Sequence, residues 1–209
     1  MKKNLNVIFT LLFVLVLPQV NFGQITGSAH DFSGEAWNTT GKICIVCHTP
    51  HNADVTITGS PLWNHEITTT AAFTLYNTTT FDGSGTIGQP DGASKLCLSC
   101  HDGTVALENF SGTTTGTNFI TGSFLLGTDL SDDHPVSFTY NTALATTDAE
   151  LYDPSTANSG LGSTIDADML FSNKMECASC HDVHNTAGIA KMLRKSNAVS
   201  ALCLTCHNK

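Results

Sequence analysis

The cysteines of this 209-residue chain carry its clearest chemical signal, because all eight fall into one repeated motif, Cys-x-x-Cys-His. The four copies are Cys44-Ile-Val-Cys47-His48, Cys97-Leu-Ser-Cys100-His101, Cys177-Ala-Ser-Cys180-His181 and Cys203-Leu-Thr-Cys206-His207. This spacing is typical of c-type haem attachment. Two thiols three residues apart on a helical turn can each add to a vinyl group of one porphyrin, and the next residue then offers an imidazole to the iron. The sequence therefore predicts four covalently bound c-type haems.

Other uses of paired cysteines explain these motifs less well. Four local disulfides would occupy every thiol of an exported protein, but they would leave the histidine after each pair unexplained. Structural zinc also binds Cys-x-x-Cys pairs, yet it does not require a histidine directly after each pair. A thioredoxin-like redox pair would be single and would lie in a β-α-β unit. Haem attachment is the interpretation that uses every cysteine together with the histidine that follows it.

The histidines outside the motifs are candidates for the second axial ligand of each iron. They are His30, His51, His65, His134 and His184. Methionine could serve instead, but the methionines beyond the amino-terminal segment do not recur at matching places. These are Met169, Met175 and Met192. Four irons need four further ligands, so the sequence supplies one histidine more than the predicted haems require.

An internal repeat selects four of these five histidines. In the first half, His30 precedes a motif that continues into His51, and a second motif follows. In the second half, His134 precedes a motif that continues into His184, and again a further motif follows. We therefore expect a single tetrahaem domain built from two diverged halves, at about 24–118 and 119–209. His65 has no equivalent in the repeat, and we expect a structural role for it.

The position of His51, three residues after His48, has a geometric consequence. Residues three apart lie on the same side of a helical turn, whereas two axial ligands must approach one iron from opposite faces. His51 is therefore expected to ligate a neighbouring haem, and His184, three residues after His181, is expected to do the same. Ligands that reach from one motif to another iron would bring the two macrocycles close together.

The amino-terminal residues have the pattern of a secretory leader. A basic start at Lys2 and Lys3 is followed by an apolar run over 7–17 and then by Pro18. The run is shorter than the about 20 apolar residues that a transmembrane helix needs, which disfavours an uncleaved anchor. We expect cleavage near Gly23, a mature domain over 24–209, no membrane span, and export through the periplasm to the cell surface or the extracellular space.

The composition of the chain limits its partners and its fold. The formal net charge is −9 and Arg194 is the single arginine, so binding to a nucleic-acid backbone is not expected. We predict a mostly irregular multihaem cytochrome c fold with a haem-centred core, short helices at the motifs and a few short strands. Helices are best supported over 94–107 and 196–207, with Ser94 and Ser196 as N-caps. Loops or edge strands are expected at 68–70, 78–80 and 113–115, and a hairpin within 119–140.

Beyond the motifs, the sequence resembles the extracellular tetrahaem cytochromes that polymerise into conductive filaments (the OmcE-like type), within the wider group with doubled Cys-x-x-Cys-His motifs. The matching stretches are 28–31, 43–52, 61–64, 88–107, 127–140, 177–185 and 200–208. The resemblance implies two histidine ligands at all four irons, His30, His51, His134 and His184 being the distal ones, and end-to-end assembly with stacked haems. It also implies that one axial histidine comes from the adjacent subunit. His30 is favoured for this role, and the alternative is that His30 acts within its own subunit while another histidine crosses over.

Four functions agree with the sequence to different degrees. Electron transfer, as the subunit of an extracellular filament, agrees best with closed iron sites, and no enzymatic activity is expected. The first alternative is a monomeric periplasmic tetrahaem carrier. The second is a multihaem oxidoreductase with an open haem site, which the surplus of strong ligands disfavours. A membrane-anchored quinol dehydrogenase would need a membrane span that the sequence does not predict.

Overall fold

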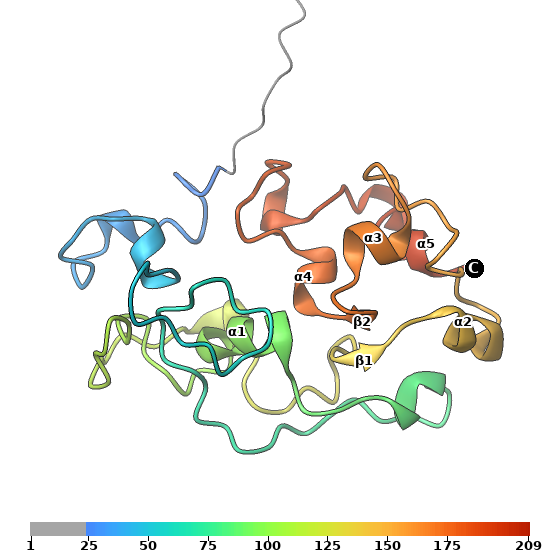
Figure 1. The fold of residues 1–209 in the computed structure, drawn as a ribbon, viewed down its shortest axis with the longest axis horizontal. Coiled ribbons are helices and arrows are strands. Elements are labelled where there is room, and N and C mark those ends of the chain that lie inside the picture. Colours follow the sequence, from blue (N-terminus) through green and yellow to red (C-terminus); the bar gives the residue numbers. More distant parts are fainter. Residues whose placement is uncertain (1–23) are drawn as a thin grey trace, which may run out of the picture.

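The computed structural model describes residues 24–209, and the predicted leader at 1–23 lies outside the described residues. The chain spreads along one long axis, with helix α1, Gly92–His101, left of centre and helix α5, Cys203–Cys206, toward the right (Figure 1). Helix α4, Cys177–Cys180, lies between them. In the described part of the chain, no helix is long and apolar enough to cross a membrane.

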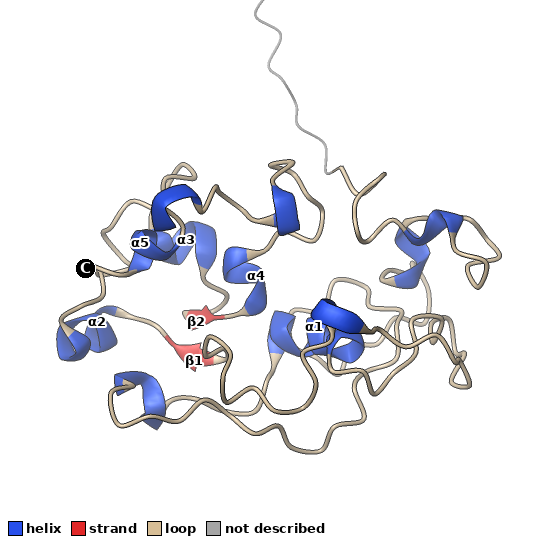
Figure 2. Ribbon diagram, turned by 180° about the vertical axis from the view of Figure 1, so that it is seen from behind, coloured by secondary structure: helices blue, strands red, loops and turns tan. Residues whose placement is uncertain are grey.

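Loops make up most of the molecule (Figure 2). The other two α-helices are α2, Thr142–Asp148, and α3, Ile165–Met169. Single 3-10 turns lie at Phe32–Gly34, Cys44–Val46, Asp82–Gly85, Gly122–Phe124, Ala190–Met192 and Ala198–Ser200. Strands β1, Phe138–Thr139, and β2, Lys174–Met175, pair antiparallel, with Phe138 opposite Met175. The prediction of a mostly irregular chain with short helices and few strands is confirmed, and the threonine-rich runs lie in loops as expected.

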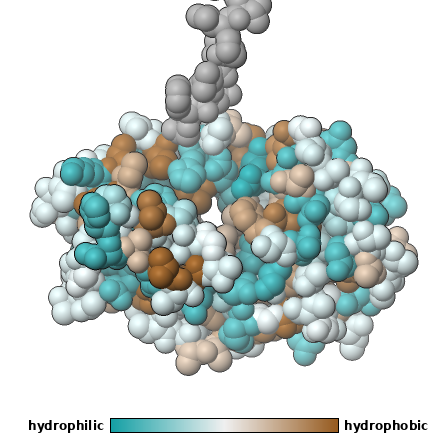
Figure 3. Space-filling model, viewed as in Figure 1, coloured by the Kyte–Doolittle hydropathy of each residue, from teal (hydrophilic) through white to brown (hydrophobic). Residues whose placement is uncertain are grey.

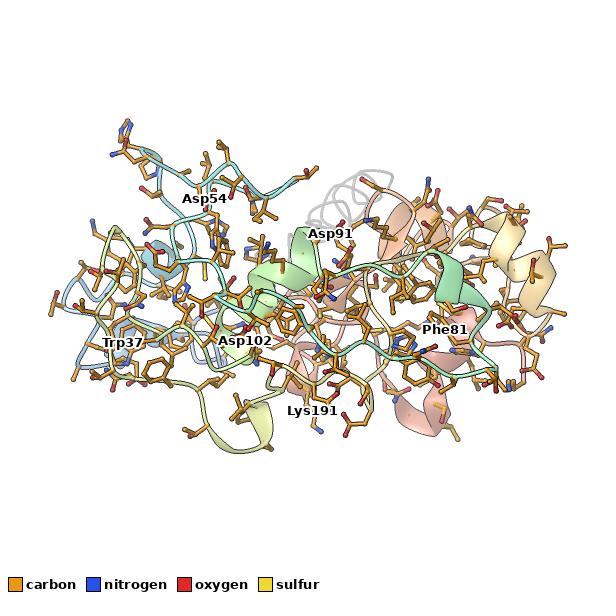
Figure 4. The ribbon with its side chains drawn as sticks, turned by 90° about the horizontal axis from the view of Figure 1, so that it is seen from below. Trp37, Asp54, Phe81, Asp91, Asp102 and Lys191 are labelled. Carbon is orange, nitrogen blue, oxygen red and sulfur yellow. The ribbon has the colours of Figure 1, made fainter. Side chains whose placement is uncertain are left out.

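Helix α1 carries the second motif, but its bounds and its cap differ from the prediction. It lies between Asp91 and Asp102, both labelled in Figure 4, rather than over 94–107. Ser94 lies inside the helix and is fully buried, so its assignment as N-cap was wrong. Its backbone N–H donates to Oε2 of Glu176 at 3.2 Å, so a residue distant in sequence caps the helix. This tertiary contact replaces the local cap that the sequence pattern predicted.

Two further local predictions were wrong. The stretch 196–207 is a 3-10 turn followed by α5 instead of one helix, because Val199 and Ser200 have left-handed φ angles of 52° and 61°. Asn197, not Ser196, precedes that turn. The hairpin expected within 119–140 does not form, since β1 pairs with the distant strand β2. A backbone reversal overrides the local pattern in the first place, and a long-range strand pairing overrides it in the second.

The buried apolar residues form two modest clusters in place of one large core. The larger contains Phe138, Tyr140, Ala145, Ile165, Met169, Leu170, Met175, Leu202 and Cys206, and the smaller contains Phe73, Leu98 and Leu130. The hydroxyl of Tyr140 donates to the carbonyl of Tyr152 at 2.6 Å and ties the larger cluster to the loop before α3. Figure 3 shows apolar residues at the surface around a hollow near the middle of the molecule.

Candidate functional site

Each Cys-x-x-Cys-His motif forms a single helical turn. In the first, third and fourth motifs, the histidine N–H donates to the carbonyl of the first cysteine, at 2.8 Å for His48, 3.1 Å for His181 and 3.0 Å for His207. The second motif forms the last turn of α1. The turn brings the two thiols and the following imidazole to one side of the backbone, which is the arrangement that covalent haem attachment requires.

Backbone carbonyl groups orient three of the four motif imidazoles. Nδ1 lies 2.6 Å from the Pro61 carbonyl in His48, 2.8 Å from that of Phe124 in His101, and 3.0 Å from that of Lys191 in His181. A carbonyl oxygen can only accept a hydrogen bond, so Nδ1 carries the proton and donates it. Nε2 is then the nitrogen with a free lone pair, which is the form that ligates a metal.

The imidazoles of three motif histidines lie opposite those of histidines outside the motifs. The ring centroids are 6.2 Å apart in the pair His48–His184, with 11° between the planes. The separation is 6.2 Å for His30–His101 and 6.4 Å for His134–His207. Each pair joins residues far apart in sequence, and His184 reaches the first motif from the second half of the chain.

The spacing within these pairs suits an iron held between two imidazoles. A metal–imidazole bond of about 2.0–2.1 Å on each side places the two ring centroids about 6 Å apart. In His134, Nδ1 also donates to a carbonyl oxygen, that of Pro135 at 2.9 Å, which leaves Nε2 free as in the motif histidines. The donor set and its separation therefore fit a haem iron with two axial histidines at three positions.

His51 and His181 do not belong to such a pair among the described residues. His51 is exposed, and its backbone carbonyl accepts a hydrogen bond from the Thr49 hydroxyl at 2.8 Å. His181 has its Nδ1 satisfied by the Lys191 carbonyl, as described above. The third motif thus presents an oriented imidazole that no other histidine of residues 24–209 opposes.

The thiols of consecutive motifs lie close to one another. Burial, with a smaller contribution from the nearby Cys47, raises the pKa of Cys100 to about 12. A hydrogen bond between Cys97 and Cys177 raises the pKa of Cys97 and lowers that of Cys177. Burial, followed by the proximity of Cys203, raises the pKa of Cys180. The thiols of consecutive motifs therefore lie within electrostatic range of one another, and those of the second and third motifs share a hydrogen bond.

The surroundings of the motifs also fit a large apolar group. Beside His101, the loop over 119–126 exposes Phe119, Phe124, Leu125 and Leu126, with exposed fractions of 45%, 61%, 42% and 43%. The Leu126 N–H donates to the His101 carbonyl at 2.8 Å, so this loop is fixed next to the motif. A group of neighbouring exposed apolar side chains is typical of a binding surface, and a porphyrin face would cover these four. The buried Nδ1 of His30 and Nε1 of Trp63 lack a hydrogen-bond partner within the described chain.

His65, the histidine without an equivalent in the repeat, does not face another histidine. It is 2% exposed, and its Nδ1 and Nε2 lie 2.8 Å and 3.1 Å from the carbonyl oxygens of Glu66 and Ala106. With both nitrogens directed at backbone acceptors, the ring is held away from any axial position.

Sequence reasoning missed the groups that orient the haem-binding residues. The carbonyl acceptors at Pro61, Phe124 and Lys191 carry no sequence signal, because every residue has a carbonyl group. It also missed Glu176, which is 3% exposed and accepts hydrogen bonds from both α1 and α4. Its position directly before Cys177 and its capping box with Ser179 were the available signal.

The comparison with protein families agrees with this geometry. Residues 171–209 match the family described as the doubled CXXCH motif, a segment that contains the third and fourth motifs. No curated protein matches the chain significantly. The match supports a multihaem c-type cytochrome, in which CXXCH motifs bind haem covalently and the haem serves electron transfer.

Proposed function

We propose that the chain binds four haems, each held by one Cys-x-x-Cys-His motif, and conducts electrons between them. The observation that carries the proposal is the set of three opposed histidine pairs, which suit iron with two strong axial ligands. Such an iron has no exchangeable position, so the sites transfer electrons instead of binding a substrate. Haem supplies one-electron chemistry, and ligation by two histidines lacks the thioether sulfur that raises the reduction potential. The protein is accordingly a low-potential carrier without enzymatic activity.

The order of the motifs supports a route for electrons along the molecule. Cys47 interacts electrostatically with Cys100 and Cys203 with Cys180, while Cys97 and Cys177 share a hydrogen bond. Since each cysteine fixes the edge of its own haem, consecutive haems approach one another in chain order. The motifs also follow one another along the long axis, as the positions of α1, α4 and α5 in Figure 1 illustrate. Electrons would enter near one end of the subunit and leave near the other.

The remaining histidines support assembly of the chain with copies of itself. His181 has no opposing histidine within the part of the chain that the structure describes, while His51 is exposed and cannot serve the iron of His48. His184 ligates across the molecule to the first motif, and the repeat predicts the reciprocal contact from His51 to the third motif. If His51 makes this contact to the next copy, each subunit donates an axial histidine at one end and receives one at the other. A head-to-tail contact that does not close produces a filament.

This assignment changes the preference derived from the sequence. His30 was favoured as the histidine that crosses to the neighbouring subunit, but its ring lies 6.2 Å from His101 of the same chain. The alternative interpretation, in which His30 acts within its own subunit and another histidine crosses over, is therefore the one proposed here. The polymer would function outside the cell in long-range electron transport, after export directed by the leader.

Secretion of matched variants tests this proposal. We expect the native secreted protein to carry four haems by mass and to appear as thin filaments in negative stain. His51→Ala should abolish or shorten the filaments while all four haems stay attached, because the residue is exposed and contributes to no pair in its own chain. His30→Ala should leave assembly in place and change one iron from low to high spin. A native protein that is strictly monomeric would refute the filament and favour the monomeric carrier.

A further inference from the structure

His65 is a buried titratable group that the proposed electron-transfer sites do not use. Its imidazole is 2% exposed and lies edge-to-face against Trp63, with ring centroids 6.3 Å apart. Both ring nitrogens are within hydrogen-bonding distance of backbone carbonyl oxygens, those of Glu66 and Ala106. The ring is therefore fixed in position by the backbone of two separate segments.

The same imidazole lies beside a haem-attachment sulfur. Nε2 of His65 is 3.6 Å from Sγ of Cys100, and Nδ1 is 3.9 Å from it. In the haem-loaded protein this sulfur is bonded to the porphyrin, so His65 is a neighbour of the haem edge. It is not an iron ligand, since the iron of this motif is served by His101 and His30.

A neutral His65 ring cannot donate a hydrogen bond to both of the carbonyl groups beside it. A neutral imidazole has one N–H, whereas the two carbonyl oxygens beside it can only accept. One carbonyl must then face a lone pair of the ring, and only the doubly protonated ring donates to both. Burial opposes that charge and lowers the pKa of His65, while the carbonyls and the Glu66 carboxylate act in the opposite direction. The neutral ring is therefore favoured, and added negative charge nearby shifts the equilibrium toward the doubly protonated ring.

We propose that His65 is a positioning residue for the haem at Cys97 and Cys100, taking up a proton when the iron of that haem gains an electron. The bound haems would supply the one-electron chemistry, and His65 would bind a proton from water at its free ring nitrogen. The inference rests on the proposed haem attachment at this motif, but it does not depend on filament formation.

The direction of the change in reduction potential follows from the linkage between reduction of the haem and protonation of His65. A proton on His65 places positive charge near the haem edge and favours the reduced iron. The reduction potential of this haem should therefore rise as the pH falls through the pKa of His65, and level off once the ring is protonated in both redox states. Full linkage of one proton to one electron changes the reduction equilibrium about tenfold per pH unit, which corresponds to about 59 mV.

The effects of other titratable groups near the site must be distinguished from that of His65. Glu66 is the charged group that acts on the ring from its own segment. Directly after α1, Asp102 acts on Cys100, and its carboxylate accepts hydrogen bonds from the hydroxyls of Thr70 and Thr104 at 2.8 Å each. In the adjoining segment, Glu108 is directed to the backbone of Thr117. The haem propionates also titrate and are present in every variant.

Potentiometric titration of the haem-loaded protein between pH 5 and 8, with the haems resolved by NMR, provides the test. The native protein should show a pH-dependent potential at the Cys97–Cys100 haem. His65→Gln retains an amide of similar size but cannot titrate, so it should flatten this dependence at that haem alone. Glu66→Gln is the matched control and should keep the dependence while moving it to lower pH, because the Glu66 carboxylate raises the pKa of His65. An unchanged slope in His65→Gln, or its loss in Glu66→Gln alone, would overturn the proposal.

A second measurement covers the case in which His65→Gln does not fold. In the native protein, an NMR titration of the His65 ring should give a higher pKa in the reduced state than in the oxidised state. Equal pKa values in the two states would reject the inference. Failure of the proposed function can be distinguished from failure of this inference. If no haem is attached at Cys97 and Cys100, the mass of the protein lacks that haem.

Discussion

At the scale of single residues, the protein orients its haem-binding imidazoles mainly through the main chain. The Nδ1 atoms of His48, His101 and His181 each donate to a backbone carbonyl. This fixes both the tautomer and the direction of the ring before a metal arrives. His134, which lies outside the motifs, uses the carbonyl of its own neighbour, Pro135, in the same way.

A change at His184 tests the pairing across the two halves. The His184 ring faces His48 at 6.2 Å, so His184→Ala should remove one axial ligand from the first haem. We expect about one quarter of the iron to become high-spin in the electron paramagnetic resonance spectrum of the ferric protein, with all four haems still attached. His65→Gln serves as the control and should leave every iron low-spin. A fully low-spin His184→Ala protein would show that another group ligates this iron.

The residues of the site were largely predictable, but their partners were not. The thiols and motif histidines followed from spacing alone, because covalent attachment is local. The repeat also selected His30 and His184 as candidate ligands. Which imidazole opposes which depends on contacts between residues far apart in sequence, such as His30 with His101. No local pattern encodes such a distance, so the assignment of His30 to the neighbouring subunit had no support from geometry.

At the scale of secondary structure, a buried polar junction holds α1 and α4 together. Oε2 of Glu176 accepts hydrogen bonds from the Ser94 N–H at 3.2 Å and from the Ser137 hydroxyl at 3.1 Å. The Ser94 hydroxyl in turn accepts from the Cys177 N–H at 3.0 Å. The second and third haem motifs are thereby fixed to each other. Removing one hydrogen-bonding partner from a buried site such as this one costs about 1–3 kcal/mol.

The Glu176 carboxyl should make stability depend on pH. Burial raises its pKa above the usual 4.5, so ionisation is less favourable in the folded than in the unfolded protein. Its contribution to stability is complete below pH 4.5 and is lost as the pH rises through the raised folded-state pKa. Glu176→Gln should remove this loss, as measured by denaturant unfolding of the haem-loaded protein over a pH series. Parallel pH profiles for the two proteins would contradict the expectation.

The bounds of the elements show where sequence patterns fail in a chain of this kind. The helix at the second motif was predicted, yet Ser94 serves as a hydrogen-bonding core residue instead of a cap. Glu176 caps that helix although it lies 82 positions after Ser94 in the sequence. Short elements have little intrinsic stability, so tertiary contacts decide where they begin and end.

At the scale of the whole molecule, the two halves of the sequence are interleaved. The turn Asp82–Gly85 contacts β1, and the Thr139 N–H donates to the Thr86 hydroxyl at 3.2 Å. Conversely, the backbone of Thr74 pairs with that of Asp129, and the loop over 119–126 lies against His101. Loss of either half would therefore expose histidine pairs and apolar residues of the other.

Dissociated subunits provide a test of the assembly at this scale. If His51 of one copy completes the iron at His181 of the next, a subunit separated from its neighbours lacks one axial ligand. We expect one high-spin haem of four in dissociated subunits and none in intact filaments. The proportion should follow the extent of dissociation measured by light scattering. Low-spin iron throughout the isolated subunit would place the missing ligand within the same chain.

The main-chain carbonyls that hold the motif imidazoles have a consequence for protein engineering. Replacing the side chains of Phe124 or Lys191 leaves their carbonyl groups in place, so the ligand orientation survives a wide range of substitutions. These positions can therefore be randomised to vary the charge and shape around the haems while loading is retained. Libraries directed at Glu176 or Ser94, whose side-chain oxygens accept the hydrogen bonds that join α1 and α4, should yield far fewer functional members.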